Sequence, residues 1–297
     1  MRAAALRLAR VPVVVGVVAA ILIVGVPFAM SQYAPYPVRP GITCVRVGPL
    51  VSGTLPFPPG MCLPLASLYR RPFIDLFVES TFRSLALLVG AAVLALVLGT
   101  LLGTMAGLWR RRVWAAGTVI GVTTLLTAVP AFFVAYFLQI AVIVIGATPQ
   151  GGSLLPVLGF GYDKHLVLPL LSISVPAVAY TAQLTATRMT EVLNADFITA
   201  ARAKGLPTLW ILRVHVLPHV RPVIFEALGS GLRVSVASLP IIEYLFLWRG
   251  IGQLALEAVG VHDAAGLIFA AVALVTFFAT LSAIADISRP RTLYRAT

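Results

Sequence analysis

Charged residues are scarce in this chain. Only 11% of its 297 residues are Asp, Glu, Lys or Arg, and 60% are hydrophobic, whereas a soluble domain carries about 25% charged residues. Several apolar stretches are long enough to cross a bilayer. They are continuous rather than alternating, which favours spanning helices over a closed barrel. The composition therefore predicts an all-α polytopic membrane protein.

Acidic residues are the rarest charged class, with 10 Asp and Glu against 22 Lys and Arg. In a soluble protein this excess would suggest nucleic acid as a partner. No basic run is interleaved with aromatic residues, so we expect no nucleic-acid binding. In a membrane protein, basic residues collect in cytoplasmic loops. With both ends of the chain inside the cell, fourteen Lys and Arg fall in cytoplasmic segments and six in outside segments. This bias predicts six transmembrane helices with cytoplasmic termini.

The predicted organisation follows from these spans. Residues 1–30 form the cytoplasmic end and first span, 31–75 a Pro- and Gly-rich extracytoplasmic loop, 76–288 a five-helix core, and 289–297 a cytoplasmic tail. The core spans are expected at about 80–108, 114–146, 165–187, 220–245 and 265–287. Pro130 is expected to kink the second of these five spans. Residues 246–264 are expected to form an outside segment.

Cysteine is almost absent. Cys44 and Cys62 are the only two cysteines, and both fall in the predicted outside loop. Because that side of the membrane is oxidising, a disulfide between them is favoured over two free thiols.

Motifs of catalysis and metal binding are missing. The chain has two lysines, Lys164 and Lys204, and neither follows a glycine, so it has no phosphate-binding Gly-Lys-Ser/Thr loop. None of the four histidines begins a His-Glu-x-x-His zinc site, although His215 and His219 could share a helical face. Gly229-Ser230-Gly231 lacks the flanking pattern of a serine nucleophile and is typical of helix packing. We therefore expect no catalytic, cofactor or metal site in this chain.

The most polar long stretch is residues 188–218. Residues 200–204 are good helix formers, Gly205 suits the left-handed position that ends a helix, and Pro207 fits the first turn of another. The pattern predicts two short helices joined by a bend on the membrane surface. An ordinary loop between two spans is the alternative.

This stretch resembles the "EAA" loop of bacterial ABC-importer permeases, in which two alanines, three residues and a glycine precede Leu-Pro. The longer run from Glu191 to Leu206 is similar to the dipeptide/oligopeptide permease subfamily, its B-type subunit in particular. Thr199 stands where the general motif has Glu, and His215 where it has an aliphatic residue. The resemblance implies that the loop docks on an ATPase subunit. The residues that it assigns to this coupling loop are Glu191, Asp196, Ala200, Ala201, Arg202, Lys204, Gly205, Leu217 and Pro218.

The resemblance also implies a fold, partners and a cargo. It implies the type I ABC-importer (MetI-like) permease fold in a bacterial inner membrane. The implied partners are a second homologous permease, two ABC ATPases that bind ATP and Mg, and an extracytoplasmic substrate-binding protein. Di- or oligopeptides are the implied cargo, with nickel or another small solute as the alternative. An ion-coupled secondary transporter is a second alternative, disfavoured because few of the ten acidic residues fall within spans.

Pathway candidates lie in and after the fifth span. Glu226 and Arg233 are two helical turns apart and share a face, so they either line the pathway or pair to fix packing. The segment from Glu243 to Gly252 is similar to the family's outer-gate segment, with Arg249 in place of a proline. The resemblance makes Glu243, Trp248, Gly250 and Gly252 gate candidates. Trp248 as an interfacial belt residue is the alternative.

Overall fold

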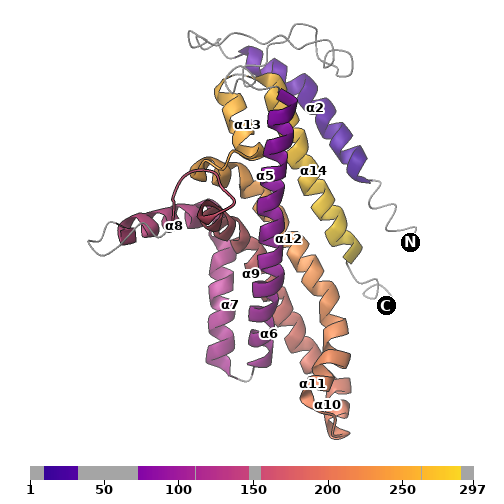
Figure 1. Cartoon of the computed structure of the whole chain (residues 1–297). Coiled ribbons are helices and arrows are strands. Elements are labelled where there is room, and N and C mark those ends of the chain that lie inside the picture. Colours follow the sequence, from indigo (N-terminus) through magenta and orange to yellow (C-terminus); the bar gives the residue numbers. More distant parts are fainter. Residues whose placement is uncertain (1–9, 33–72, 111, 147–154, 262, 289–297) are drawn as a thin grey trace.

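The computed structural model describes residues 10–32, 73–110, 112–146, 155–261 and 263–288, and this part of the chain is helical without strands. Figure 1 shows long helices side by side, with α10 and α11 at one end and α13 near the other. The α-helices are α2 (Arg10–Gln32), α5 (Phe73–Leu94), α6 (Thr100–Leu108), α7 (Val113–Ala128), α8 (Ala131–Gly146), α9 (Val167–Leu193), α10 (Asp196–Ala203), α11 (Thr208–Trp210), α12 (Leu217–Phe246), α13 (Ile251–Gly260) and α14 (Ala264–Ser288). Two π-helical segments, η1 (Ala95–Gly99) and η3 (Ile211–Val216), connect α5 to α6 and α11 to α12.

Within the described residues, four helical runs are long and apolar enough to cross a membrane. They are Phe73–Leu108, Lys164–Leu193, Thr208–Phe246 and Ala264–Asp286. The bent pair α7 and α8 makes a fifth if it counts as one span, while the apolar run Val11–Ile23 of α2 is shorter. The six-span count therefore stays a prediction.

The α5 run begins earlier than the predicted start at residue 80. Its first turns pack on α14, where the ring of Phe269 lies 5.3 Å from Phe73 and 5.7 Å from Phe77. This aromatic cluster stabilises the helix from Phe73 onward, before the apolar stretch that the sequence predicts to begin at about residue 80.

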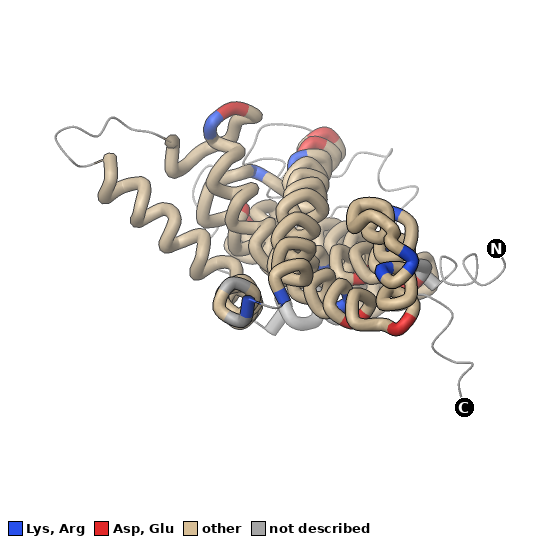
Figure 2. The backbone as a smooth tube through the Cα atoms, turned by 90° about the horizontal axis from the view of Figure 1, so that it is seen from below, with Lys and Arg blue, Asp and Glu red and all other residues tan. Residues whose placement is uncertain are grey.

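The predicted span at 114–146 bends sharply at Pro130 and consists of two helices. That the pair crosses the membrane as one span stays a prediction. The axes of α7 and α8 differ by 103° at the break around Pro130. A residue that precedes proline is driven out of the helical region, and Val129 is extended, with φ −85° and ψ 123°. Figure 2, which views the molecule from below, shows α8 projecting to one side as a tube without charged residues.

The centre of the bundle is the contact between α9 and α12. A Cβ atom on Gly231 would lie 2.5 Å from the Cα atom of Ala177, and one on Gly229 would lie 2.4 Å from the Cβ atom of Ala285 in α14. The Ser235 hydroxyl donates to the carbonyl oxygen of Ile173 at 2.7 Å. These close approaches confirm that Gly229 and Gly231 serve helix packing.

A second close contact joins α6 to α9. Glycines spaced by four residues place one backbone directly against the other, a pattern that allows close helix approach in membranes. The contacts are Gly99 on Thr181, Gly103 on Thr185 and Gly107 on Met189. The hydroxyls of Thr181 and Thr185 are buried there without a hydrogen-bond partner, so shape complementarity holds this contact.

Gly103→Ala should therefore destabilise the bundle. Its Cβ atom would lie 2.5 Å from the Ala182 carbonyl oxygen and 2.6 Å from the Thr185 Cβ atom, and overpacking of this kind costs about 1–3 kcal/mol. Thermal unfolding in detergent should show a lower Tm. Gly117→Ala, where the added atom has nothing within 4 Å, is the matched control. Equal Tm values for the two variants would contradict the role of this contact.

Two predictions lie outside the described residues. Cys44 and Cys62, with their disulfide, belong to residues 33–72, and the tail belongs to residues 289–297. Both remain expectations from the sequence.

Candidate functional site

The bend between α9 and α12, here called the elbow (residues 194–216), turns at Gly205. The Gly205 N–H donates to the Arg202 carbonyl at 2.9 Å, and the Leu206 N–H donates to the Ala201 carbonyl at 3.3 Å. These are the two bonds of a Schellman motif, which requires a left-handed residue, and Gly205 has φ +74°. The predicted helix end at Gly205 is confirmed.

The inner face of the elbow is a small apolar core. Ile198 and Ala201 of α10 are buried against Ile211 and Val216, which follow α11, and against Val220 of α12. This packing fixes α10 to the start of the long helical run Thr208–Phe246. One expectation is wrong here: the second arm of the elbow is no separate short helix, because α11 and η3 continue into α12 without a break.

The outer face of the elbow carries apolar side chains that the sequence reasoning missed. Leu209 is 78% exposed and Trp210 46%, and Phe197 is exposed on α10. Exposed side chains of this size at a polar end are typical of a docking surface. The available signal was three large apolar residues within an otherwise polar stretch.

Polar contacts tie the elbow to its neighbours. Arg188 forms an ion pair with Glu191 at 2.9 Å, and the Arg110 Nε atom donates to the Asn194 side-chain oxygen at 3.0 Å. The remaining predicted coupling residues occupy both sides of the elbow. Asp196, Ala200, Arg202, Lys204, Leu217 and Pro218 are exposed, and Ala201 is buried.

At the opposite end of α12, Glu243 is completely buried. Its Oε2 atom accepts the backbone N–H groups of Gly252 at 2.7 Å and of Gln253 at 3.1 Å. Its Oε1 atom accepts the hydroxyl of Ser84 from α5, and that hydroxyl accepts the N–H of Ile251 at 2.8 Å. One carboxylate thereby caps the first turn of α13 and joins three helices.

The packing around this carboxylate leaves no room for a side chain at Gly250 or Gly252. A Cβ atom on Gly250 would lie 2.1 Å from the Glu243 Oε1 atom, and one on Gly252 would lie 2.5 Å from the Cα atom of Pro240. The sequence reasoning grouped these residues, and the structure brings them into contact. It missed Ser84, which is 159 positions from Glu243 along the chain.

Trp248 completes this end, here called the outer cluster (Ser84, Glu243, Trp248, Gly250 and Gly252). Its backbone N–H donates to the Glu243 carbonyl at 2.9 Å, and its Nε1 atom donates to the Arg83 carbonyl at 3.2 Å. The side chain is 0% exposed, and its ring lies 4.9 Å from that of Phe160. Trp248 is therefore a packed residue of the protein interior rather than one facing lipid headgroups.

The loop beside the outer cluster carries one perturbed carboxyl group. The His165 side chain lies 2.7 Å from the Asp163 Oδ1 atom. This hydrogen bond, with a second from the His165 backbone, holds the pKa of Asp163 below its usual value.

A family model of the "binding-protein-dependent transport system inner membrane component" matches residues 99–294, which include the elbow and every residue of the outer cluster except Ser84. The chain belongs to this family.

Relatives of this chain include permeases of the peptide family. The chain is 26% identical over 200 residues to the glutathione transport system permease protein GsiC of Shigella flexneri, a match that covers 67% of this chain and 63% of the relative. It is 33% identical over 118 residues to a putative peptide permease protein of Brucella ovis, covering 39% and 37%. The chain thus matches less than two thirds of the length of these relatives.

A solved structure supports the permease fold. The MetNI methionine ABC transporter, in inward-facing conformations, contains a chain that superposes with a TM-score of 0.56 at 18% identity. The match covers 74% of this chain and 99% of the other. The predicted MetI-like fold is confirmed.

Two further pathway candidates of this permease lie in α12, between the elbow and the outer cluster. Glu226 and Arg233 are half-buried in α12, and Arg233 donates to the Ser230 hydroxyl at 2.9 Å. Both interpretations of the two charges, pathway lining and packing, stay open.

The His219 Nδ1 atom lies 2.8 Å from the His215 carbonyl oxygen, and in the described part of the permease no three His, Cys, Asp or Glu side chains form a metal-binding group.

Proposed function

We propose that this chain is the membrane subunit of an ATP-driven importer of di- or oligopeptides. It contributes half of the pathway, pairs with a second permease, and receives substrate from an extracytoplasmic binding protein. Two separate ATPase subunits bind ATP and Mg, and their closure moves the elbow. The chain itself catalyses no reaction.

The observation that carries this proposal is the mechanical continuity of the elbow with the outer cluster. The run Thr208–Phe246 has 39 residues, about 58 Å at 1.5 Å per residue. At one end, its first turn exposes Leu209 and Trp210. At the other end, it supplies Glu243, which holds α13. A displacement of the elbow is thus transmitted along one helix to the outer end.

The peptide cargo rests on the names of the relatives, which are permeases for glutathione or for peptides. The test is uptake by proteoliposomes that contain this chain, a second permease, its ATPases and its binding protein. We expect uptake of a labelled dipeptide that requires ATP and is not competed by Ni²⁺. Uptake by this chain alone, driven by a proton gradient, would refute the proposal in favour of a secondary transporter.

The proposed orientation places the elbow and both chain ends in the cytoplasm. Figure 1 shows that the start of α2 and the end of α14 point toward the elbow end. In a variant with Cys44 and Cys62 replaced by serine, Thr208→Cys should resist an impermeant thiol reagent on intact cells and react after lysis. Leu158→Cys is the control: it is 54% exposed, and the adjacent Gly159 N–H binds the Phe246 carbonyl at the outer end. Labelling of Thr208→Cys on intact cells would show that the elbow faces the outside, which would refute the proposed topology and the coupling role.

A further inference from the structure

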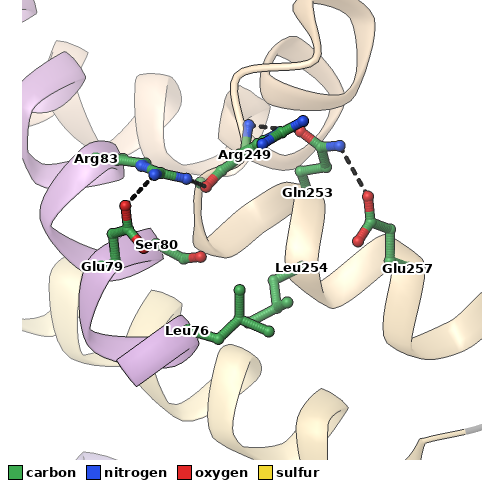
Figure 3. Close-up of a pocket in the computed structure, with 9 residues that line it drawn as sticks. Leu76, Glu79, Ser80, Arg83, Arg249, Gln253, Leu254 and Glu257 are labelled. Carbon is green, nitrogen blue, oxygen red and sulfur yellow. Dashed lines mark hydrogen bonds and ion pairs between the residues drawn. The ribbon is translucent and has the colours of Figure 1, made fainter. Parts of the chain in front are cut away.

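A polar pocket lies at the outer end, between α5 and the segment that enters α13. Its volume is about 220 Å³, which is the space of roughly seven water molecules. Figure 3 shows charged and amide side chains of both walls around it. The lining residues are Leu76, Glu79, Ser80, Arg83, Arg249, Gly250, Gln253, Leu254 and Glu257.

The α5 wall of the pocket is held by internal contacts. Arg83 forms an ion pair with Glu79, and its guanidinium carbon lies 4.1 Å from the centre of the Phe160 ring. A second nitrogen of the guanidinium donates to the Arg249 carbonyl at 3.4 Å. The charge of Arg83 is thus balanced by its neighbours, and Arg83 serves to position the backbone of Arg249.

Arg249 has an unusual backbone, with φ +56°. Non-glycine residues rarely adopt this region, and they persist there where the surroundings hold them. The Arg249 N–H donates to the Gln253 Oε1 atom at 2.6 Å, and its carbonyl accepts from Arg83. A proline could adopt neither this φ nor this N–H bond. The local conformation therefore excludes proline at this position.

The opposite pole of the pocket is the carboxylate of Glu257. Its Oε1 atom accepts the Gln253 side-chain N–H at 2.8 Å. An ionised carboxylate has about four lone-pair sites, so it accommodates further donors. The Gln253 side chain thus lies between Arg249 and Glu257, and it accepts a hydrogen bond from the backbone of the first and donates one to the carboxylate of the second (Figure 3).

We propose that this pocket binds the two charged ends of a short peptide. The guanidinium of Arg249 receives the α-carboxylate, for which its planar donors are suited, and Glu257 receives the α-ammonium group. The pocket volume admits a molecule of about dipeptide size and excludes a folded partner. This inference rests on the proposed function and adds a recognition site for the cargo on the outer side of the membrane subunit.

The test is titration calorimetry of the purified full chain in lipid nanodiscs with L-alanyl-L-alanine. We expect the dipeptide to bind, and its N-acetylated and C-amidated forms to bind at least tenfold more weakly. Arg249→Gly keeps the backbone angle because glycine adopts positive φ freely, and it removes the whole side chain with its guanidinium. Arg249→Gly and Glu257→Gln should each weaken binding at least tenfold, while Arg249→Lys, which keeps the charge, should lose less.

Three outcomes would overturn the inference: no binding of the dipeptide to the unmodified chain, equal binding of the blocked dipeptides, or unchanged binding by Arg249→Gly. Gly260→Ala, at an open position of α13, is the control for general damage to that helix. If Arg249→Gly weakens only the binding of the delivery protein, the pocket is a protein contact and the inference fails. ATP-driven uptake with no dipeptide bound to this chain would refute the pocket site and leave the importer function intact.

Discussion

Glu243→Ala should destabilise this permease by about 3–9 kcal/mol. The substitution removes the acceptor of the Gly252 and Gln253 N–H groups and of the Ser84 hydroxyl. Each buried donor left without a partner costs about 1–3 kcal/mol. The outer cluster would lose the link between α5, α12 and α13. The expected measurement is a large drop in Tm in detergent, with earlier proteolysis of α13.

Two variants make this prediction specific. Glu243→Gln keeps one acceptor oxygen and nearly the same shape, so it should lose less stability than the alanine variant. Glu191→Ala removes a carboxylate whose ion pair with Arg188 is solvent-exposed, and exposed pairs contribute about 0–1 kcal/mol. If Glu243→Ala melts like Glu191→Ala, the carboxylate does not hold the outer cluster together.

Gly205→Val should uncouple ATP hydrolysis from uptake. The added Cβ atom has nothing within 4 Å, so the effect comes from the backbone alone. A φ of +74° costs a residue with a side chain about 1–2 kcal/mol, and a β-branched residue is the least tolerant. That cost lowers the ratio of native to non-native elbow roughly 5- to 30-fold. In reconstituted importers, we expect uptake per ATP hydrolysed to fall, by at most this factor.

Gly205→Asn is the matched control, because asparagine tolerates the left-handed region. It should retain most of the uptake per ATP, while Gly205→Val should not. The bundle itself should keep its Tm in both variants, since Gly205 is exposed and lies outside the apolar core of the elbow. Normal uptake per ATP in Gly205→Val would show that the bend does not transmit force.

The two sites differ in how far the sequence could predict them. The elbow is local: its small residues, glycine and proline stand within about 25 positions, and short-range rules fix its helix end. The outer cluster is half local. Glu243, Trp248, Gly250 and Gly252 stand close together in the chain, but Ser84 and Arg83 come from α5, more than 150 positions away.

The break at Pro130 shows a different limit. A proline inside an apolar stretch predicts some bend, and the sequence alone does not state its size. The 103° angle turns α8 away from the direction of α7, so a stretch long enough for one span becomes two helices.

By itself, the sequence determined the class of the protein, its helical character, and the turn at Gly205, because hydropathy and backbone preference act over short distances. Only the tertiary structure decided which side chains meet across helices. It brought Ser84 into contact with Glu243, packed Gly99, Gly103 and Gly107 against α9, and placed Arg249 in a pocket with Glu257. Such contacts depend on how helices cross, and crossing is set by the packing of whole surfaces rather than by neighbours in the chain.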